Sequence, residues 1–145
     1  MKPATRATGN QIALLQTLDI QLKEIAPTHA IMEVTVAPKH LNYFGGAHGG
    51  LIATLIDTVC FFPGPLLPAG RVVTTSNLNI HFLRPAALGD HLCARADLLH
   101  LGRRTVSLRI AVENQQGQLI AHGTATLQVL AEPSSPSSVA TSAEA

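Results

Sequence analysis

The sequence is poor in charge and has no long apolar run. Charged residues make up 13% of the 145 residues, about half the ~25% of an average soluble chain. Ten Lys and Arg against nine Asp and Glu leave a formal net charge of +1. This balance provides no basic surface for nucleic acid or for an anionic membrane. No apolar stretch approaches the ~20 residues of a membrane span. Neither nucleic acid nor a membrane is therefore an expected partner.

Cysteine is also scarce, and no secretory signal begins the chain. Cys60 and Cys93 lie in apolar sequence, and no hydrophobic block follows the basic start MKPATRATGNQ. We expect free thiols and a cytoplasmic protein. The histidines at positions 40, 81, 91, 100 and 122 show no metal-ligand spacing, so we expect them on the surface or in strands and expect no metal.

The length fits one domain with a real core. The sequence predicts a flexible N-terminus over residues 1–9, a folded domain over 10–130 and a disordered tail, rich in Ser, Pro and Ala, over 131–145. A hydrophobic content of 46% with so few charges also favours a surface covered by another copy of the chain.

Hydrophobic periodicity predicts an α+β fold with one antiparallel sheet of five to six strands around one long helix. A short helix is expected from Asn10, and Pro27-Thr28-His29 is typical of a hairpin turn. Val106, Leu108, Ile110 and Val112 should share one buried face. The expected strands are Asp19–Ile25, Ala30–Ala37, Val72–Phe82, His91–Leu101, Thr105–Glu113 and Gln118–Leu130.

The long helix, expected from about His48 to Phe62, has almost no charged face. Such a helix should be buried, here in the curl of the sheet. Its one ionisable carboxyl group, Asp57, has only Ala53 and Phe61 one turn away. Asp57 either faces solvent at an edge of the helix or lies in an apolar cleft, which is the setting of a general base or a nucleophile.

The start of this helix is rich in glycine, with the sequence Gly45-Gly46-Ala47-His48-Gly49-Gly50. Unpaired backbone N–H groups and the positive end of the helix dipole suit an anion or a developing oxyanion there. The spacing matches neither the P-loop nor the dinucleotide-binding fingerprint. Nucleotide binding by those routes is therefore not expected.

Together these residues resemble the hotdog-fold acyl-CoA thioesterases, and most of all the branch of 4-hydroxybenzoyl-CoA and phenylacetyl-CoA thioesterases. The resemblance rests on Asn42, on His48-Gly49-Gly50 six residues later, and on Asp57 nine residues after the histidine. The stretches VTTSNLNIHFLRP and LGD, and the final strand with its IAHG, are also similar. The resemblance spans residues 10–130.

The resemblance implies thioester hydrolysis with coenzyme A as part of the substrate and with no other cofactor. The Gly49 N–H would bind the oxyanion, and Asn42 would orient the thioester or the water. Asp57 would act as general base or nucleophile, and Thr75 would bind the attacking water. The site would span the interface of a dimer, which pairs further into a dimer of dimers, with Asn42 and Gly49 from one subunit and Asp57 and Thr75 from the other.

Five further residues are candidates for substrate binding. His48 is either an acid–base group or, as the resemblance implies, a structural residue, and Gly50 adjoins the oxyanion donor. Phe61 should line the acyl pocket and favour aryl or short-to-medium acyl groups. Arg84 and Arg103 either hold CoA phosphates or are ordinary solvated residues.

Three other interpretations remain open. The chain could be a non-catalytic acyl-CoA-binding hotdog protein, although no DNA-binding segment flanks the domain. It could be a hydroxyacyl-thioester dehydratase, whose chemistry needs a histidine placed with a carboxylate. It could also be a structural dimeric domain without a ligand.

Overall fold

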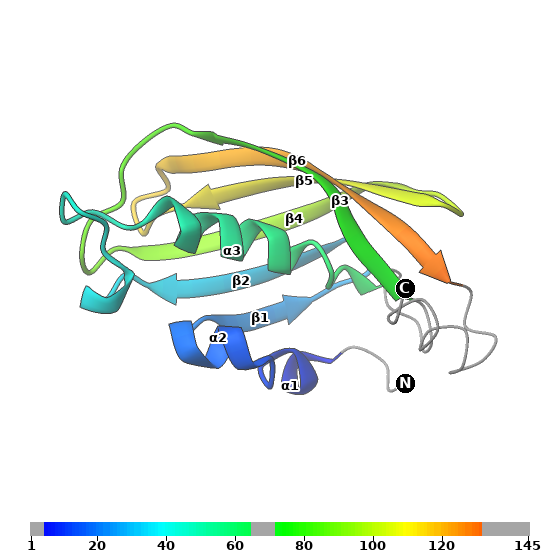
Figure 1. Ribbon diagram of the computed structural model, residues 1–145, viewed down its shortest axis with the longest axis horizontal. Coiled ribbons are helices and arrows are strands. Elements are labelled where there is room, and N and C mark those ends of the chain that lie inside the picture. Colours follow the sequence, from blue (N-terminus) through cyan, green and yellow to red (C-terminus); the bar gives the residue numbers. More distant parts are fainter. Residues whose placement is uncertain (1–4, 65–71, 132–145) are drawn as a thin grey trace.

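The computed structural model describes residues 5–64 and 72–131. Its six strands form one antiparallel sheet in the order β1-β2-β4-β5-β6-β3. Helix α3 lies along one face of this sheet, and α1 and α2 lie beside β1 (Figure 1). The elements are α1 Arg6–Gly9, α2 Ala13–Leu18, β1 Gln21–Ile25, β2 His29–Thr35, a 3-10 turn Pro38–His40, α3 Gly49–Val59, β3 Val72–Phe82, β4 His91–Leu101, β5 Thr105–Glu113 and β6 Leu119–Ala131.

The core lies between α3 and the sheet. One face of β5 points into it, and Val106, Leu108, Ile110 and Val112 are fully buried, as their alternation predicts. The α3 side chains Leu51, Ile52, Leu55, Ile56 and Val59 are buried against the sheet. The predicted α+β architecture with a buried central helix is therefore confirmed.

The first helix differs from its prediction, because α2 begins at Ala13 rather than at Asn10 and an additional short helix, α1, precedes it. The Asn10 side chain bonds to the backbone of β1: it accepts a hydrogen bond from Leu22 N (2.7 Å) and donates one to Leu22 O (3.2 Å). The segment before it is also folded: Thr5 caps α1, and Gly9 is buried. A side chain on Gly9 would lie 2.5 Å from Leu22 Cδ2. The flexible start expected over residues 1–9 therefore does not extend to Arg6–Gly9, and residues 1–4 lie outside the described residues.

The other boundaries shift by a few residues. Strand β1 begins at Gln21 because Asp19 adopts a left-handed conformation that ends α2 (φ 56°). The predicted turn lies between Ala26 and His29, joined by a 2.8 Å hydrogen bond. Helix α3 ends at Val59, and the Phe62 N–H bonds to Val59 O in a tighter turn before Pro63. Of the tail expected over residues 131–145, Ala131 belongs to β6, and residues 132–145 lie outside the described residues.

Candidate active site

The loop before α3 is tightly braced. Leu41 and Ala47 form an isolated β-bridge, and Asn42 N donates to Gly46 O at 2.7 Å. Gly45 supplies the positive φ of 84° that the reversal requires. Ala47 N donates to Ala86 O at 2.8 Å, which ties the loop to the segment after β3. The helix start is therefore held in position by its own loop.

The side chain of Asn42 is part of this bracing. Its Oδ1 atom accepts hydrogen bonds from Phe44 N (2.9 Å) and from Gly46 N (3.1 Å). Within the described residues its Nδ2 group donates to no acceptor. Only the Nδ2 group of Asn42 therefore remains available for its expected role of orienting a thioester or a water. The sequence did not reveal the structural half of its role, although Asn followed by a turn and Gly is a known signal.

His48 forms the N-cap of α3. Its Nδ1 atom accepts a hydrogen bond from Gly50 N at 2.7 Å, which is the structural alternative considered from the sequence. Gly50 therefore cannot offer its N–H to a substrate, contrary to its assignment beside the oxyanion donor. A Cβ atom on Gly50 would also lie 2.9 Å from His48 Nδ1.

The Gly49 N–H is left open by this cap. It is the first N–H of α3, and no acceptor within residues 5–64 and 72–131 bonds to it. Helix geometry gives it no intrahelical partner, and it lies at the positive end of the helix dipole. A Cβ atom on Gly49 would meet only the Phe82 ring, at 3.5 Å. This N–H can donate to the oxygen of an incoming carbonyl group.

A buried histidine supports the cap. His40 is 3% exposed, its Nδ1 accepts from Ala37 N (2.9 Å), and its Nε2 bonds to Leu18 O (2.7 Å). Its own carbonyl oxygen accepts from His48 N at 2.8 Å. The prediction of a surface or strand position is therefore wrong for His40, because the 3-10 turn needs a side chain that can satisfy these backbone groups.

Asp57 and Thr75 lie together. Thr75 Oγ1 donates to Asp57 Oδ1 at 2.6 Å, and both side chains are partly buried. Asp57 therefore has a polar partner within the same chain, which neither interpretation of its sequence context included. The second carboxylate oxygen, Oδ2, bonds to no group in the described part of the chain.

A β-bulge makes this contact possible. Thr75 and Leu78 lie opposite Leu127 and Ala125, which both face the core. Residues three apart would point to opposite faces of a regular strand. The register shifts between Thr75 and Asn77. The extra residue, Ser76, therefore lets both Thr75 and Leu78 face α3.

The thiol nearest to Asp57 is not a nucleophile. Burial raises the pKa of the Cys60 thiol far above its usual range, and the Asp57 carboxylate raises it further. Cys60 Sγ also donates to Ile56 O at 3.1 Å. The reactive thiolate is therefore almost absent at neutral pH.

The Gly49 N–H and the Asp57 carboxylate lie at different points along α3. Asp57 lies eight positions after Gly49, which is about 12 Å at the helical rise of 1.5 Å per residue. A thioester carbonyl group cannot contact both from one side of one chain. Strand β3, which carries Thr75, is an edge of the described sheet.

The remaining predicted residues divide between these two ends. Phe61, partly buried against the core, follows Asp57 at the end of α3. Arg84 is exposed just after Phe82, on the Gly49 side. Arg103 is exposed in the β4–β5 turn, whose Arg104 O accepts from Val129 N. Val129 pairs with Val73, so this turn lies at the Thr75 end of the sheet.

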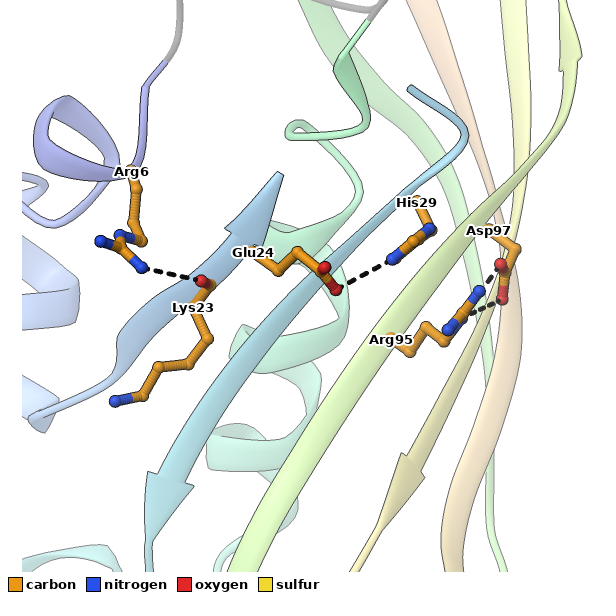
Figure 2. Close-up of polar contacts among 6 residues, drawn as sticks. All are labelled: Arg6, Lys23, Glu24, His29, Arg95 and Asp97. Atoms are coloured by element: carbon orange, nitrogen blue, oxygen red, sulfur yellow. Dashed lines mark hydrogen bonds and ion pairs between the residues drawn. The ribbon is translucent and has the colours of Figure 1, made fainter. Parts of the chain in front are cut away.

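A pocket of about 830 Å³ lies elsewhere on the described residues. Its lining residues Ile31, Glu33 and Cys93 alternate with core residues, so it opens on the sheet face opposite α3. Figure 2 shows two contacts between side chains near it, Glu24 with His29 (2.9 Å) and Arg95 with Asp97 (3.1 Å). None of the residues predicted for the site lines it.

Two absences hold within residues 5–64 and 72–131. No group of three His, Cys, Asp or Glu side chains could hold a metal ion. No helix is long and apolar enough to cross a bilayer.

Curated relatives are similar over most of their length. The chain is 32% identical over 105 residues to acyl-coenzyme A thioesterase 13 of Homo sapiens, covering 72% of this chain and 75% of the relative. It is 32% identical over 109 residues to the acyl-coenzyme A thioesterase PaaI of Escherichia coli, covering 75% and 76%.

Solved structures are similar as well. The PaaI protein of the E. coli phenylacetic acid degradation operon superposes with a TM-score of 0.79 at 28% identity, covering 86% of this chain and 89% of that one. The protein smu.793 of Streptococcus mutans, solved with acetyl CoA, gives a TM-score of 0.71 at 32% identity, covering 78% and 90%. Residues 44–121 match the family model of the thioesterase superfamily. The chain therefore belongs to the thioesterase superfamily and is a thioester hydrolase with the hotdog fold.

Proposed function

We propose that this chain hydrolyses the thioester of aryl or short-to-medium-chain acyl-CoA. The observation that carries the proposal is the open Gly49 N–H at the start of a buried helix, combined with the Asp57 carboxylate held by Thr75. Relatives named acyl-coenzyme A thioesterases and a neighbour solved with acetyl CoA support acyl-CoA as the substrate class. Coenzyme A enters as part of the substrate, and the proposal requires no further cofactor.

In this mechanism the thioester carbonyl oxygen accepts a hydrogen bond from the Gly49 N–H. Negative charge grows on this oxygen as the carbon becomes tetrahedral, and a fixed donor at a helix N-terminus stabilises it. One such donor contributes about 10²–10³ in rate. The free Nδ2 group of Asn42 is available to orient the thioester or the water.

Asp57 then activates the attack. As a general base, its Oδ2 accepts a proton from water while the water oxygen bonds to the carbonyl carbon; the C–S bond then breaks and the thiolate takes up a proton. As a nucleophile, the carboxylate itself attacks the carbonyl carbon, the C–S bond breaks and the CoA thiolate leaves and takes up a proton; water then hydrolyses the resulting mixed anhydride and regenerates the carboxylate. Thr75 occupies Oδ1 in both routes, and its hydroxyl oxygen can still accept a hydrogen bond from the water.

The site requires two copies of the chain. Because Gly49 and Asp57 of one chain lie about 12 Å apart, the Gly49 of one subunit must meet the Asp57 and Thr75 of another. The free edge of β3 and the exposed apolar side chain of Leu83, in the segment after β3, support an interface there. The proposed assembly is a dimer or a dimer of dimers, located in the cytoplasm.

The candidate substrate-binding residues also divide between the Gly49 side and the Asp57 side of the site. Phe61 would limit the acyl pocket beside Asp57, and Arg84 and Arg103 would hold CoA phosphates at opposite ends of each chain, which a dimer brings together. His48 serves the helix cap. A dehydratase reaction needs a histidine placed with a carboxylate, whereas the His48 ring is bonded to Gly50.

Thiol release from a panel of acyl-CoA thioesters tests the function. The panel contains benzoyl, phenylacetyl and straight-chain acyl groups from short to long, and wild type is compared with Asp57→Asn. We expect wild-type turnover of aryl or short-to-medium thioesters and a loss of about 10²–10⁴ in the folded variant. Unchanged activity in Asp57→Asn would identify another base. Binding without turnover in both proteins would favour the non-catalytic acyl-CoA-binding alternative.

A further inference from the structure

The few aromatic side chains of this protein gather at the two ends of α3. The chain has one Tyr, four Phe and no Trp. Phe61 and Phe62 follow the end of α3, and the other three lie near its start, as described below. Apart from Phe62, the buried hydrophobic core contains only aliphatic, Met and Cys side chains. Aromatic residues are therefore absent from most of the core, where their large area would stabilise the fold most.

Two aromatic residues project from the braced loop. Tyr43 is 95% exposed and Phe44 is 91% exposed, and their rings form an edge-to-face pair with centroids 5.3 Å apart. The backbone that carries them is held by Asn42, whose Oδ1 accepts from Phe44 N itself. Two large apolar side chains on a fixed backbone are thus presented to solvent before any ligand binds.

A third aromatic residue borders the oxyanion donor. The Phe82 ring would lie 3.5 Å from a Cβ atom on Gly49, and Phe82 is 55% exposed. An isolated β-bridge between Gly46 and Ala87 joins the Tyr43–Phe44 loop to the segment that follows Phe82. Phe82 therefore borders the helix start directly, and the loop that carries Tyr43 and Phe44 leads into the same helix start.

We propose that Tyr43, Phe44 and Phe82 form an aromatic wall beside the Gly49 N–H, and that this wall binds the acyl group and selects flat aryl groups over straight chains. The inference rests on the proposed function. A carbonyl oxygen bonded to Gly49 N–H brings the acyl group within a few ångströms of Phe82. Contact between aromatic rings stabilises binding beyond the burial of apolar area. A straight acyl chain gains only from the burial of apolar area.

The chemistry of the wall favours the acyl group over the CoA part of the substrate. The pantetheine arm carries two amides that need hydrogen-bond partners, and the three side chains offer only the hydroxyl group of Tyr43. A fixed backbone also lowers the cost of ordering the contact on binding. A wall that stacked on adenine instead would serve every acyl-CoA equally, because all of them share that group.

The test compares kcat/KM for phenylacetyl-CoA and hexanoyl-CoA. The variants are Phe82→Leu, which keeps an apolar side chain but removes the ring, and the double variant Tyr43→Ala/Phe44→Ala. The control is Leu99→Ala, which removes an equally exposed apolar side chain (54%) from the bulge in β4. We expect the aryl-to-alkyl ratio to fall about 2–10-fold in each wall variant and to stay at the wild-type value in the control.

Binding gives a second measurement that does not depend on turnover. Thioether analogues with a methylene between sulfur and carbonyl, one aryl and one hexyl, are titrated into the same proteins by calorimetry, and the same change in ratio is expected. An unchanged ratio, or an equal loss for both ligands, would overturn the inference. Dissociation of the wall variants into monomers on sedimentation would also overturn it, because the side chains would then be subunit contacts. Absence of wild-type hydrolysis with both thioesters would contradict the proposed function, while the binding ratio would still decide the inference.

Discussion

Thr75 Oγ1 donates a 2.6 Å hydrogen bond to Asp57 Oδ1, joining an edge strand to the single acidic residue of α3. The bond fixes one carboxylate oxygen and leaves Oδ2 free in the described part of the chain. A carboxylate with one occupied and one open oxygen is oriented for a single direction of attack. In the proposed mechanism the Thr75 hydroxyl is therefore a positioning group for Asp57.

Replacing Thr75 by Val should lower kcat while leaving the fold intact. Val keeps the β-branched shape that suits a strand but cannot donate to Asp57. A hydrogen bond to a charged group is worth about 1.5–3 kcal/mol, which corresponds to about 10–100-fold in rate. Steady-state kinetics on the best thioester of the panel measure the loss.

Thr75→Ser is the matched control, since it retains the hydroxyl group. It should restore most of kcat, and the melting temperatures of both variants should stay close to wild type. Equal activity of the Val and Ser variants would show that the bond to Asp57 has no part in catalysis.

His48→Ala should destabilise the protein by removing the cap on Gly50 N. Loss of an N-cap side chain costs about 0.5–2 kcal/mol, which lowers Tm by a few degrees in a domain of this size. His48→Asn can cap the helix in the same way and should recover most of the loss. Thermal unfolding followed by circular dichroism measures both effects.

The same pair of variants distinguishes a cap from an acid–base group. If His48 only caps α3, His48→Asn keeps the pH dependence of kcat. The disappearance of one limb of the pH–rate profile in His48→Asn would instead assign a titrating role to His48.

Asp90 should stabilise the fold in a pH-dependent way. Its carboxylate accepts hydrogen bonds from Ala87 N (2.8 Å) and Gln115 Nε2 (3.0 Å), which hold its pKa below the usual aspartate value of 3.8. A carboxyl group with a lowered folded-state pKa stabilises the protein above its ordinary pKa. This contribution is lost as the pH falls through the lowered value.

Urea unfolding of wild type and Asp90→Asn tests this contribution. The difference in unfolding free energy should be constant near neutral pH and shrink as the pH falls below 3.8. The turn held by Asp90 also bears the Ala87 bridge to Gly46. A difference that grows on acidification would contradict the assigned bonds.

Much of the fold could be predicted from the sequence, because strand alternation is a local signal. Strands β3, β4 and β5 have the predicted bounds, since the alternation of β5 is unbroken and turn residues flank β4 and β5. The break between α1 and α2 could not be predicted. It depends on the bonds from Asn10 to Leu22, which is distant in sequence and becomes a neighbour only in the folded chain.

Part of the candidate site could likewise be predicted from the sequence, and part could not. The glycine-rich helix start and the isolated Asp57 are visible in the sequence because each violates the ordinary pattern of a helix. The bulge at Ser76 that turns Thr75 toward Asp57 carries no such local mark. A structural role for His48 was among the alternatives, but its bond to Gly50 N depends on the rotamer of one ring and could not be predicted.

In the proposed assembly, Gly49 of one subunit and Asp57 of another form one hydrolytic site. Gly49→Pro removes only the oxyanion donor, because proline is tolerated at the first position of a helix. The extended conformation of His48 (ψ 137°) suits a following proline. Gly49→Ala, which keeps the N–H, is the control.

The most direct measurement mixes Gly49→Pro and Asp57→Asn subunits after denaturation and refolding together. Each variant alone should be nearly inactive. A mixed dimer has one site with both Gly49 and Asp57 intact, so random pairing should restore about a quarter of the wild-type thiol release. A mixture that stays as inactive as its components, although mixed dimers have formed, would contradict a site shared between subunits.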